Sequence, residues 1–255
     1  MKKILLYAVG CVVIVVCVVC YFVFTQTREL QECKSEQDKI SGCVEKEYDE
    51  NGNLESEFPY KNGERHGVAK EYYGNGNLMY EIPYKNDMQH GVEKEYYKNG
   101  NLKYETPYEN DKQHGVEKWY DGNGNLEREI PYENDKKHGV EKGYYENRNL
   151  KYEIPFENGE QHGVEKGYYE NGKLKFEFPY ENDKKHGVAK AYYENGKLKY
   201  EIPYENDKRH GIAKAYYENG NLQAQVTYEN GSVVSGVCGD GKKIPNIQGL
   251  GYWGD

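Results

Sequence analysis

The histidines are the residues whose type and spacing first suggest chemistry. All seven recur at an interval of 24 residues, at His66, His90, His114, His138, His162, His186 and His210. Imidazole is a common zinc ligand, but zinc ligands converge on one ion at bond lengths of about 2.0 Å. Equivalent positions two strands apart in a sheet are separated by about 9.5 Å. We therefore expect no metal site and no cofactor, and we predict that each histidine packs against a turn.

Other patterns that support catalysis or nucleic-acid binding do not occur in the sequence. It contains only five serines and four threonines, and no nucleophile stands at a spacing that would pair it with a base. No glycine-rich phosphate loop lies between a predicted strand and a helix. The formal net charge of −9 opposes contact with nucleic-acid phosphates. These features predict a protein that is not an enzyme and does not bind nucleic acid.

A repeat of 24 residues organises the chain over residues 42–231. Leucine recurs at this interval without exception from Leu54 to Leu222, and proline recurs from Pro59 to Pro203. Repetition at a fixed interval of this length predicts an array in which each unit packs against its neighbours. Eight such units fit between residues 42 and 231.

Each unit contains two strand-like segments and two turn signals. In the second unit the segments are residues 67–73 and 78–84, with Asn75 and Gly76 between them. The link to the next unit carries Gly or Asp at the position of Asp87, which suggests a left-handed backbone there. The predicted fold is therefore all-β: an elongated, single-layer antiparallel sheet of stacked β-hairpins with sixteen strands.

The expected register follows from amphipathicity. A loop of three residues, 74–76, pairs Tyr72 with Leu78 and Val68 with Ile82. One face of the second unit then collects the residues that we expect in the core: Val68, Lys70, Tyr72, Leu78, Tyr80, Ile82 and Tyr84. The opposite, polar face collects Ala69, Glu71, Met79, Glu81 and Pro83.

Variable positions on the predicted polar face, or alternatively an edge of the sheet, are the candidate contacts with a partner. They form one column of the repeat: Glu71, Glu95, Trp119, Gly143, Gly167, Ala191 and Ala215. Trp119 is a candidate because an exposed aromatic side chain is a common centre of an interface, and a tolerated surface substitution is the alternative interpretation. Glu71 and Glu95 add acidic charge. The many tyrosines are expected to pack in the core.

The N-terminus has the features of a membrane anchor. Residues Ile4 to Phe24 carry no charge and, as a helix, would span about 31 Å, the thickness of one hydrocarbon core. Lys2 and Lys3 precede this segment, which predicts a cytoplasmic N-terminus and extracytoplasmic repeats, periplasmic or at the cell surface. A cleaved signal peptide and a lipoprotein signal at Cys11 remain alternatives. The expected organisation is an anchor or transmembrane helix at 1–24, a polar stalk at 25–41, eight repeats at 42–231 and a C-terminal cap or tail at 232–255.

The repeat array constrains disulfide pairing. Cys43 and Cys238 lie at opposite ends of the predicted array, beyond the distance of about 7 Å that a disulfide allows between Cα atoms. Cys33 with Cys43 is the one intrachain pair outside the apolar segment that the array permits in an oxidising compartment, and the sequence leaves open whether it forms.

The unit HGVEKEYYKNGNLKYETPYENDKQ resembles the MORN repeat variant found in proteins classed as YwqK-type antitoxin components. The resemblance rests on Gly, Tyr-Tyr, Asn-Gly-Asn/Lys-Leu, an acidic residue, Tyr, and Asn-Gly or Asn-Asp, repeated eight times over residues 42–231. It implies an antiparallel hairpin array with a non-enzymatic binding role, and neutralisation of a cognate toxin. MORN-type arrays are also associated with membranes and with protein scaffolding.

The sequence therefore predicts a bacterial-type, membrane-anchored repeat protein that binds another protein through its acidic, variable face. The alternatives are an envelope or surface protein that binds glycan or lipid headgroups, and a structural spacer. The sequence does not indicate an oligomeric state.

Overall fold

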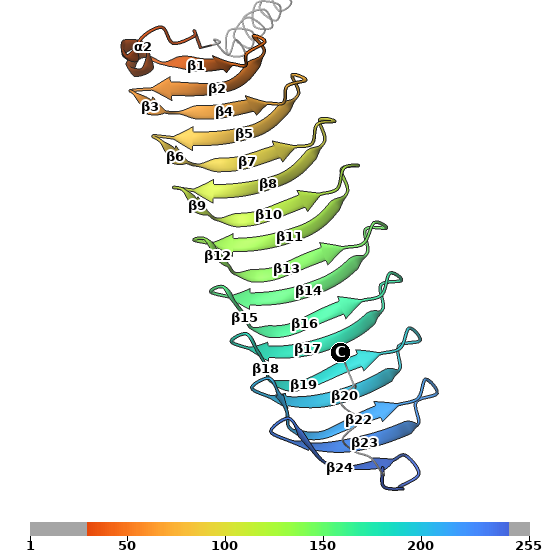
Figure 1. Ribbon diagram of the computed structural model, residues 1–255. Helices are drawn as coiled ribbons and strands as arrows, with labels where there is room; N and C mark the ends of the chain where they lie inside the picture. Colours follow the sequence, from red (N-terminus) through yellow and green to blue (C-terminus); the bar gives the residue numbers. More distant parts are fainter. Residues whose placement is uncertain (1–29, 245–255) are drawn as a thin grey trace, which may run out of the picture.

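The computed structural model describes residues 30–244, which form one antiparallel sheet of 24 strands. Consecutive strands lie side by side along an elongated, curved column, with the first hairpin at one end and the last strand at the other (Figure 1). The sheet is a single layer, and a short helix lies at its N-terminal end (Figure 1). The predicted array of stacked hairpins is confirmed.

Each of the eight units contributes one pair of long strands. The first strands of the pairs are β1 (Cys43–Tyr48), β4 (Gly67–Tyr72), β7 (Gly91–Tyr96), β10 (Gly115–Tyr120), β13 (Gly139–Tyr144), β16 (Gly163–Tyr168), β19 (Gly187–Tyr192) and β22 (Gly211–Tyr216). The second strands are β2 (Leu54–Lys61), β5 (Leu78–Lys85), β8 (Leu102–Glu109), β11 (Leu126–Glu133), β14 (Leu150–Glu157), β17 (Leu174–Glu181), β20 (Leu198–Glu205) and β23 (Leu222–Glu229).

The sheet has more strands than the sixteen expected, because each link between units folds into a small hairpin of its own. Asn86 and Asp87 both adopt positive φ, 54° and 63°, and turn the chain back so that a strand of two residues pairs with the end of β5. The predicted left-handed backbone at the link is confirmed. The link strands are β3 (Glu64–Arg65), β6 (Met88–Gln89), β9 (Lys112–Gln113), β12 (Lys136–Lys137), β15 (Glu160–Gln161), β18 (Lys184–Lys185) and β21 (Lys208–Arg209), and β24 (Ser232–Cys238) closes the array against β23.

The loop between the two long strands has the predicted length. The Gly76 amide donates to the Tyr73 carbonyl at 2.7 Å, and the Tyr73 amide donates to the Asn77 carbonyl at 2.8 Å. Gly76 has φ of 83°, and Arg148, which occupies the same position in the fifth unit, adopts the same left-handed region with φ of 68°. A three-residue loop with a left-handed third residue is a common hairpin connection.

A β-bulge follows this loop and changes the register of the rest of the hairpin. Tyr72 pairs with Leu78 as predicted, but Glu71 pairs with Tyr80, so that Met79 is an extra residue. The predicted pairing of Val68 with Ile82 is therefore wrong: Val68 pairs with Pro83, and Ala69 pairs with Ile82. A shift of one residue exchanges the two faces of a strand.

Burial agrees with the shifted register. Ala69 is 0% exposed, whereas Val68 is 45% exposed, the reverse of the expectation from the sequence. We call the face with the residues equivalent to Ala69, Glu71, Tyr80, Ile82 and Tyr84 the core face. The outer face carries those equivalent to Val68, Lys70, Tyr72, Glu81 and Pro83.

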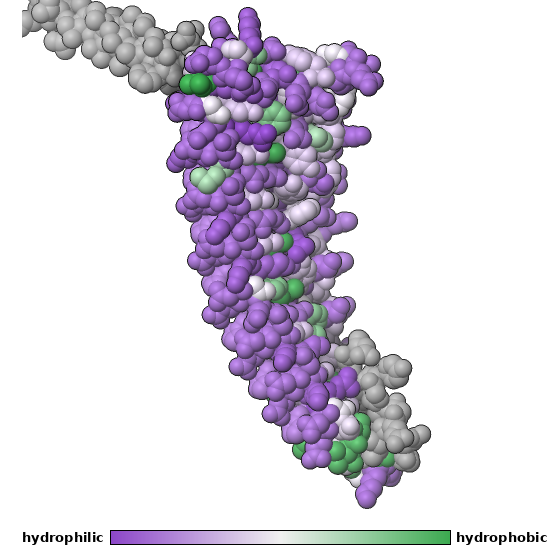
Figure 2. Space-filling model, turned by 60° about the vertical axis from the view of Figure 1, so that its left-hand side comes forward, coloured by the Kyte–Doolittle hydropathy of each residue, from purple (hydrophilic) through white to green (hydrophobic). Residues whose placement is uncertain are grey.

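The hydrophobic core is concentrated at the C-terminal end. Ile202, Ala213, Val226 and Tyr228 form a buried cluster, against which Ile244 packs. Hydrophobic residues also gather near this end in the view of Figure 2, while most of the remaining visible surface is hydrophilic. In units three to six the position of Ala69 is occupied by glutamate, so hydrogen bonds replace much of the apolar packing there.

The N-terminal end is closed by α2 (Glu36–Ser41) and a disulfide. Asn62 and Gly63 donate their amides to the carbonyls of the helix residues Ile40 and Lys39, at 3.0 Å each. No helix among residues 30–244 has both the length and the apolar character needed to cross a bilayer. The predicted transmembrane helix at residues 4–24 lies outside the described residues.

Cys33 and Cys43, the pair that the sequence left open, form a disulfide with a sequence separation of 10. We expect the double variant Cys33→Ser/Cys43→Ser to lose about 2 kcal/mol of stability, because the crosslink restricts the unfolded chain. Chemical denaturation of both proteins, followed by circular dichroism, measures the difference. Replacement of the free, exposed Cys238 by Ser is the control and should leave the midpoint unchanged; equal midpoints for all three proteins would contradict the prediction.

Candidate functional site

The column of predicted contacts lies on the core face, because the bulge exchanges the two faces. The placement of Trp119, Glu71 and Glu95 on an outer polar face is therefore wrong. Glu95 is 7% exposed and accepts a hydrogen bond from the Lys103 ammonium at 2.8 Å. Glu71 is half-buried opposite Tyr80.

Trp119 is half-buried against its neighbours on the core face. Its ring packs on Tyr104 with a centroid distance of 5.1 Å and an interplanar angle of 39°. Its indole nitrogen donates to the Glu117 carboxylate at 2.5 Å. Trp119 also lines a surface pocket, described below, so it still has access to a ligand.

Small residues in the same column let aromatic rings lie across the sheet. A Cβ atom added at Gly143 would overlap the Tyr152 ring, and one added at Gly167 would overlap the Phe176 ring. Ala191 and Ala215 are buried. The variation in this column therefore sets how each ring packs over the core face.

Carboxylates are buried on the core face of the middle units. Glu117 is 7% exposed and Glu141 is 4% exposed. Glu141 accepts hydrogen bonds from the Arg128 guanidinium at 2.9 Å, the Lys137 ammonium at 2.8 Å and the Tyr152 hydroxyl at 3.3 Å. Burial raises the pKa of the neighbouring Glu93 carboxyl above its usual range. Within residues 30–244, no three His, Cys, Asp or Glu side chains gather in a way that could hold a metal ion.

Removal of one hydrogen-bond partner of Glu141 should reduce the stability of the protein. We expect Arg128→Met to reduce the free energy of unfolding by about 2 kcal/mol, because it leaves a buried carboxylate with less compensation. Lys214→Met removes an ion pair of the same 2.9 Å length, but its partner Glu201 is more exposed, and we expect a loss of about 0.5 kcal/mol. Thermal unfolding of the two variants tests this difference; equal losses would show that burial of Glu141 has no special weight.

The histidines lie at the turns, as predicted. The backbone amide of each one donates to the carbonyl of the proline seven residues earlier; for His66 the acceptor is Pro59, at 2.9 Å. The His66 ring nitrogen Nδ1 lies 3.2 Å from the side-chain oxygen of Asn86 in the next link. The ring therefore packs between two consecutive turns.

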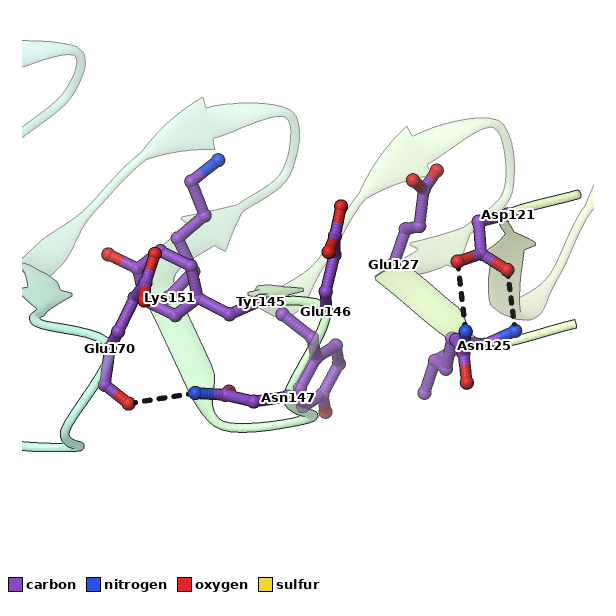
Figure 3. A pocket seen from close by; sticks show the side chains of 10 residues that line it. Asp121, Asn125, Glu127, Tyr145, Glu146, Asn147, Lys151 and Glu170 are labelled. Atoms are coloured by element: carbon purple, nitrogen blue, oxygen red, sulfur yellow. Dashed lines mark hydrogen bonds between the residues drawn. The ribbon is translucent and has the colours of Figure 1, made fainter. Parts of the chain in front are cut away.

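A surface pocket of about 790 Å³ lies between the loops of the fourth and fifth hairpins. We call it the hairpin slot. Figure 3 shows two hydrogen bonds at the slot. On one side the Asn125 side-chain nitrogen donates to the Asp121 carboxylate, and on the other the Asn147 side-chain nitrogen donates to the Glu170 carbonyl. The remaining lining comes from Leu126, Glu127, Tyr144, Tyr145, Glu146 and Lys151.

The hairpin slot adjoins a second pocket of about 300 Å³, which extends to the core face. Glu127, Tyr144 and Lys151 line both pockets, and Trp119 lines the second together with Arg128 and Tyr152. Together the two pockets place aromatic rings beside acidic side chains, an arrangement suited to side chains of a partner. Of the three predicted contact residues, only Trp119 lines either pocket.

Two departures from the repeat mark the hairpin slot in the sequence, although neither residue was among the predicted contacts. The residue that follows the last tyrosine of the first strand is Tyr in units two, three and five to eight, but it is Asp121 in the fourth unit and Asp49 in the first. Glu127 likewise interrupts a column that is lysine in units three and five to seven.

The fold and these pockets define an open β-hairpin repeat protein. The chain belongs to the MORN repeat variant family: the family's model matches eight segments, at residues 44–62, 65–86, 89–110, 113–134, 137–158, 161–182, 185–206 and 209–230. A search of curated proteins found no match.

Two solved structures are similar over part of their length. One is a crystal structure of TcdB2-TccC3 without its hypervariable C-terminal region, with 13% identity and a TM-score of 0.22. The other is a crystal structure of TcdB2-TccC3-Cdc42, with 13% identity and a TM-score of 0.16. In both, the match covers 77% of this chain and 13% of the other chain.

Proposed function

We propose that this protein is a non-enzymatic binding module for another protein, anchored in a membrane through residues 4–24. The observation that carries the proposal is the pair of adjoining pockets at the fourth and fifth hairpins, which connect Trp119 on the core face to the hairpin slot. Aromatic side chains in recessed sites are the usual centres of binding energy in protein interfaces. The acidic residues around these pockets favour a partner with a basic surface.

The finer form of the proposal is an antitoxin or immunity protein whose partner is a toxin. An extracytoplasmic array has to meet that toxin outside the cytoplasm. Expression of the captured partner alone should then arrest growth, and co-expression of this chain should restore it. Growth that is unaffected by the partner would exclude the toxin version and leave a scaffold role.

The proposal is tested by affinity capture with the full-length chain in mild detergent, against membranes and secreted material of its own source. We expect one protein to be recovered in stoichiometric amount, and Trp119→Ala to reduce its recovery at least tenfold. Val116→Ala is the matched control, because Val116 lies on the same strand β10 but is 43% exposed on the outer face. Recovery of glycan or lipid alone would instead favour the envelope-binding role, and recovery of nothing would favour the spacer.

A further inference from the structure

Neighbouring hairpins are linked by tyrosine hydroxyl groups at their loops. In the second unit the Tyr73 hydroxyl donates to the backbone carbonyl of Tyr96, in the next unit, at 2.7 Å. Five junctions contain this contact, with oxygen–oxygen distances from 2.7 to 2.9 Å: Tyr73 to Tyr96, Tyr97 to Tyr120, Tyr145 to Tyr168, Tyr169 to Tyr192 and Tyr193 to Tyr216.

The junction between the fourth and fifth hairpins lacks this contact. Asp121 stands where units two, three and five to eight have tyrosine, as Asp49 does in the first unit. The Asp121 carboxylate accepts hydrogen bonds from its own loop, from the amides of Asn123 and Asn125 at 2.8 Å each. Among the described residues, no hydroxyl group donates to the Tyr144 carbonyl. In the five junctions named above, the equivalent backbone carbonyl accepts a hydrogen bond from a tyrosine hydroxyl. The hairpin slot is the space beside the Tyr144 carbonyl, where that tyrosine is missing.

The same junction also loses an amide contact. The side-chain nitrogen of Asn101 donates to the Gly122 carbonyl of the next unit at 2.8 Å, and Asn149 donates to Glu170 at 2.7 Å. The equivalent Asn125 nitrogen donates instead to Asp121, at 3.0 Å. At the loops, the side chain of Arg148 crosses this junction, with its guanidinium 3.4 Å from the Asn125 oxygen.

The charge of the slot differs from that of the filled junctions. In the third unit the Lys103 ammonium lies 6.0 Å from the centroid of the Tyr97 ring, and Lys151 lies 5.7 Å from that of Tyr145. Glu127 occupies the lysine position in the fourth unit, so a carboxylate replaces the cation there, and Lys151 of the fifth unit is the one lysine that lines the slot. Hydrogen bonds from Asn125 hold the pKa of Asp121 below its usual range, which keeps its carboxylate charged.

From these observations we propose that the hairpin slot binds a tyrosine side chain of the partner, flanked by lysine or arginine. The phenol donates its hydroxyl to the Tyr144 carbonyl, and the adjacent cation pairs with Glu127. This inference rests on the proposed function, since it names the part of a protein partner that the site receives. Phosphotyrosine is disfavoured as an occupant, because the carboxylates of Asp121, Glu127, Glu146 and Glu170 outnumber the one lysine, Lys151, in the lining.

A short peptide provides a direct probe of the slot. The full-length chain in detergent micelles is titrated with acetyl-Lys-Tyr-Lys-amide and followed by NMR of the backbone amides. We expect shifts at residues 121–127 and 144–148, and binding at least about fivefold weaker for the same peptide with Phe, since Phe cannot donate to the carbonyl. Equal binding of the Tyr and Phe peptides, or shifts absent from residues 144–148, would overturn the proposal.

Two double variants extend the test: one fills the hairpin slot, and the other creates an equivalent slot at a different junction. Asp121→Tyr/Glu127→Lys restores the residues of the third unit and should abolish the shifts at residues 144–148. Tyr97→Asp/Lys103→Glu should open a second slot and add shifts at residues 120–124. Asp49→Tyr/Glu55→Lys makes the same exchange in the first hairpin and is the matched control, which should leave the shifts at 144–148 unchanged. Circular dichroism confirms that each variant is folded.

The outcomes separate this inference from the proposed function. If Trp119→Ala abolishes capture of the partner and Asp121→Tyr/Glu127→Lys does not, the slot is not the tyrosine site, while the binding role stands. If the peptide binds in the slot and no protein is captured, the inference that the slot binds tyrosine is supported and the proposed function is contradicted.

Discussion

This protein should unfold cooperatively between pH 10 and pH 12. On the outer face, one tyrosine of each unit from the second to the seventh donates its hydroxyl to a glutamate of the preceding unit. Burial and this hydrogen-bonded, charged neighbour raise the pKa of each tyrosine to about 12, from about 10 in an unfolded chain. The pairs are Tyr72–Glu57, Tyr96–Glu81, Tyr120–Glu105, Tyr144–Glu129, Tyr168–Glu153 and Tyr192–Glu177.

The direction in which stability changes with pH follows from proton linkage. Below pH 10 both states keep the phenol protons, and the stabilisation is constant. Between pH 10 and pH 12 the unfolded chain releases these protons while the folded chain keeps them, so stability falls as pH rises. Six equivalent groups act together, which makes the fall steep.

The transition is measured by circular dichroism, with tyrosine ionisation followed in parallel by ultraviolet absorbance. Tyr144→Phe removes one of the six groups and should make the decline in stability between pH 10 and pH 12 less steep. Tyr48 occupies the same column in the first unit, is 51% exposed and has no preceding hairpin, so Tyr48→Phe should leave the decline unchanged. Ionisation of all phenols in a protein that keeps its sheet at pH 12 would contradict the prediction.

Gly115→Ala should reduce the free energy of unfolding by about 3 kcal/mol. Gly115 has φ of 119°, a conformation that residues with a Cβ atom rarely adopt and that costs about 1–3 kcal/mol. An added Cβ atom would also lie 2.8 Å from Cγ of Pro107, which cannot move freely within its ring. The six equivalent glycines have φ between 106° and 127°, so this requirement belongs to the repeat itself.

Gly122 gives a matched control in the same hairpin. It has no positive φ, and a Cβ atom there would meet nothing within 4 Å. Gly122→Ala should therefore change stability by less than about 0.5 kcal/mol. Denaturant titration of both variants compares them directly. Because units contact mainly their neighbours, the Gly115 variant should also show a broadened transition, with one half of the array unfolding first; equal stability of the two variants would refute the argument.

Much of the fold could be predicted from local sequence. The spacing of leucine and proline indicated the number of units, and Asn75-Gly76 indicated the position and length of the hairpin loop. These features act within a few residues of one another, because glycine and asparagine tolerate the left-handed backbone that the turns require. The sequence permitted Cys33–Cys43 as an intrachain pair, because the length of the array separates Cys238 from Cys43, but only the structure showed that this disulfide forms.

The assignment of faces could not be predicted in the same way. Alternation with a period of two fits either face, and one extra residue at Met79 exchanges them. The bulge brings Tyr80 opposite Glu71, and it leaves Tyr72 on the outer face, where its hydroxyl donates to Glu57 of the preceding hairpin. Trp119, Glu71 and Glu95 were therefore assigned to the wrong face.

The sequence by itself thus determined the repeat, its turns and its membership of the MORN repeat variant family. The tertiary structure decided which side chains face inward and where the array has an opening. Both depend on contacts between residues of different hairpins, such as Tyr97 with Tyr120 and the missing equivalent at Asp121. A local pattern cannot reveal them, because a hydrogen bond between hairpins forms only when the register of both is fixed.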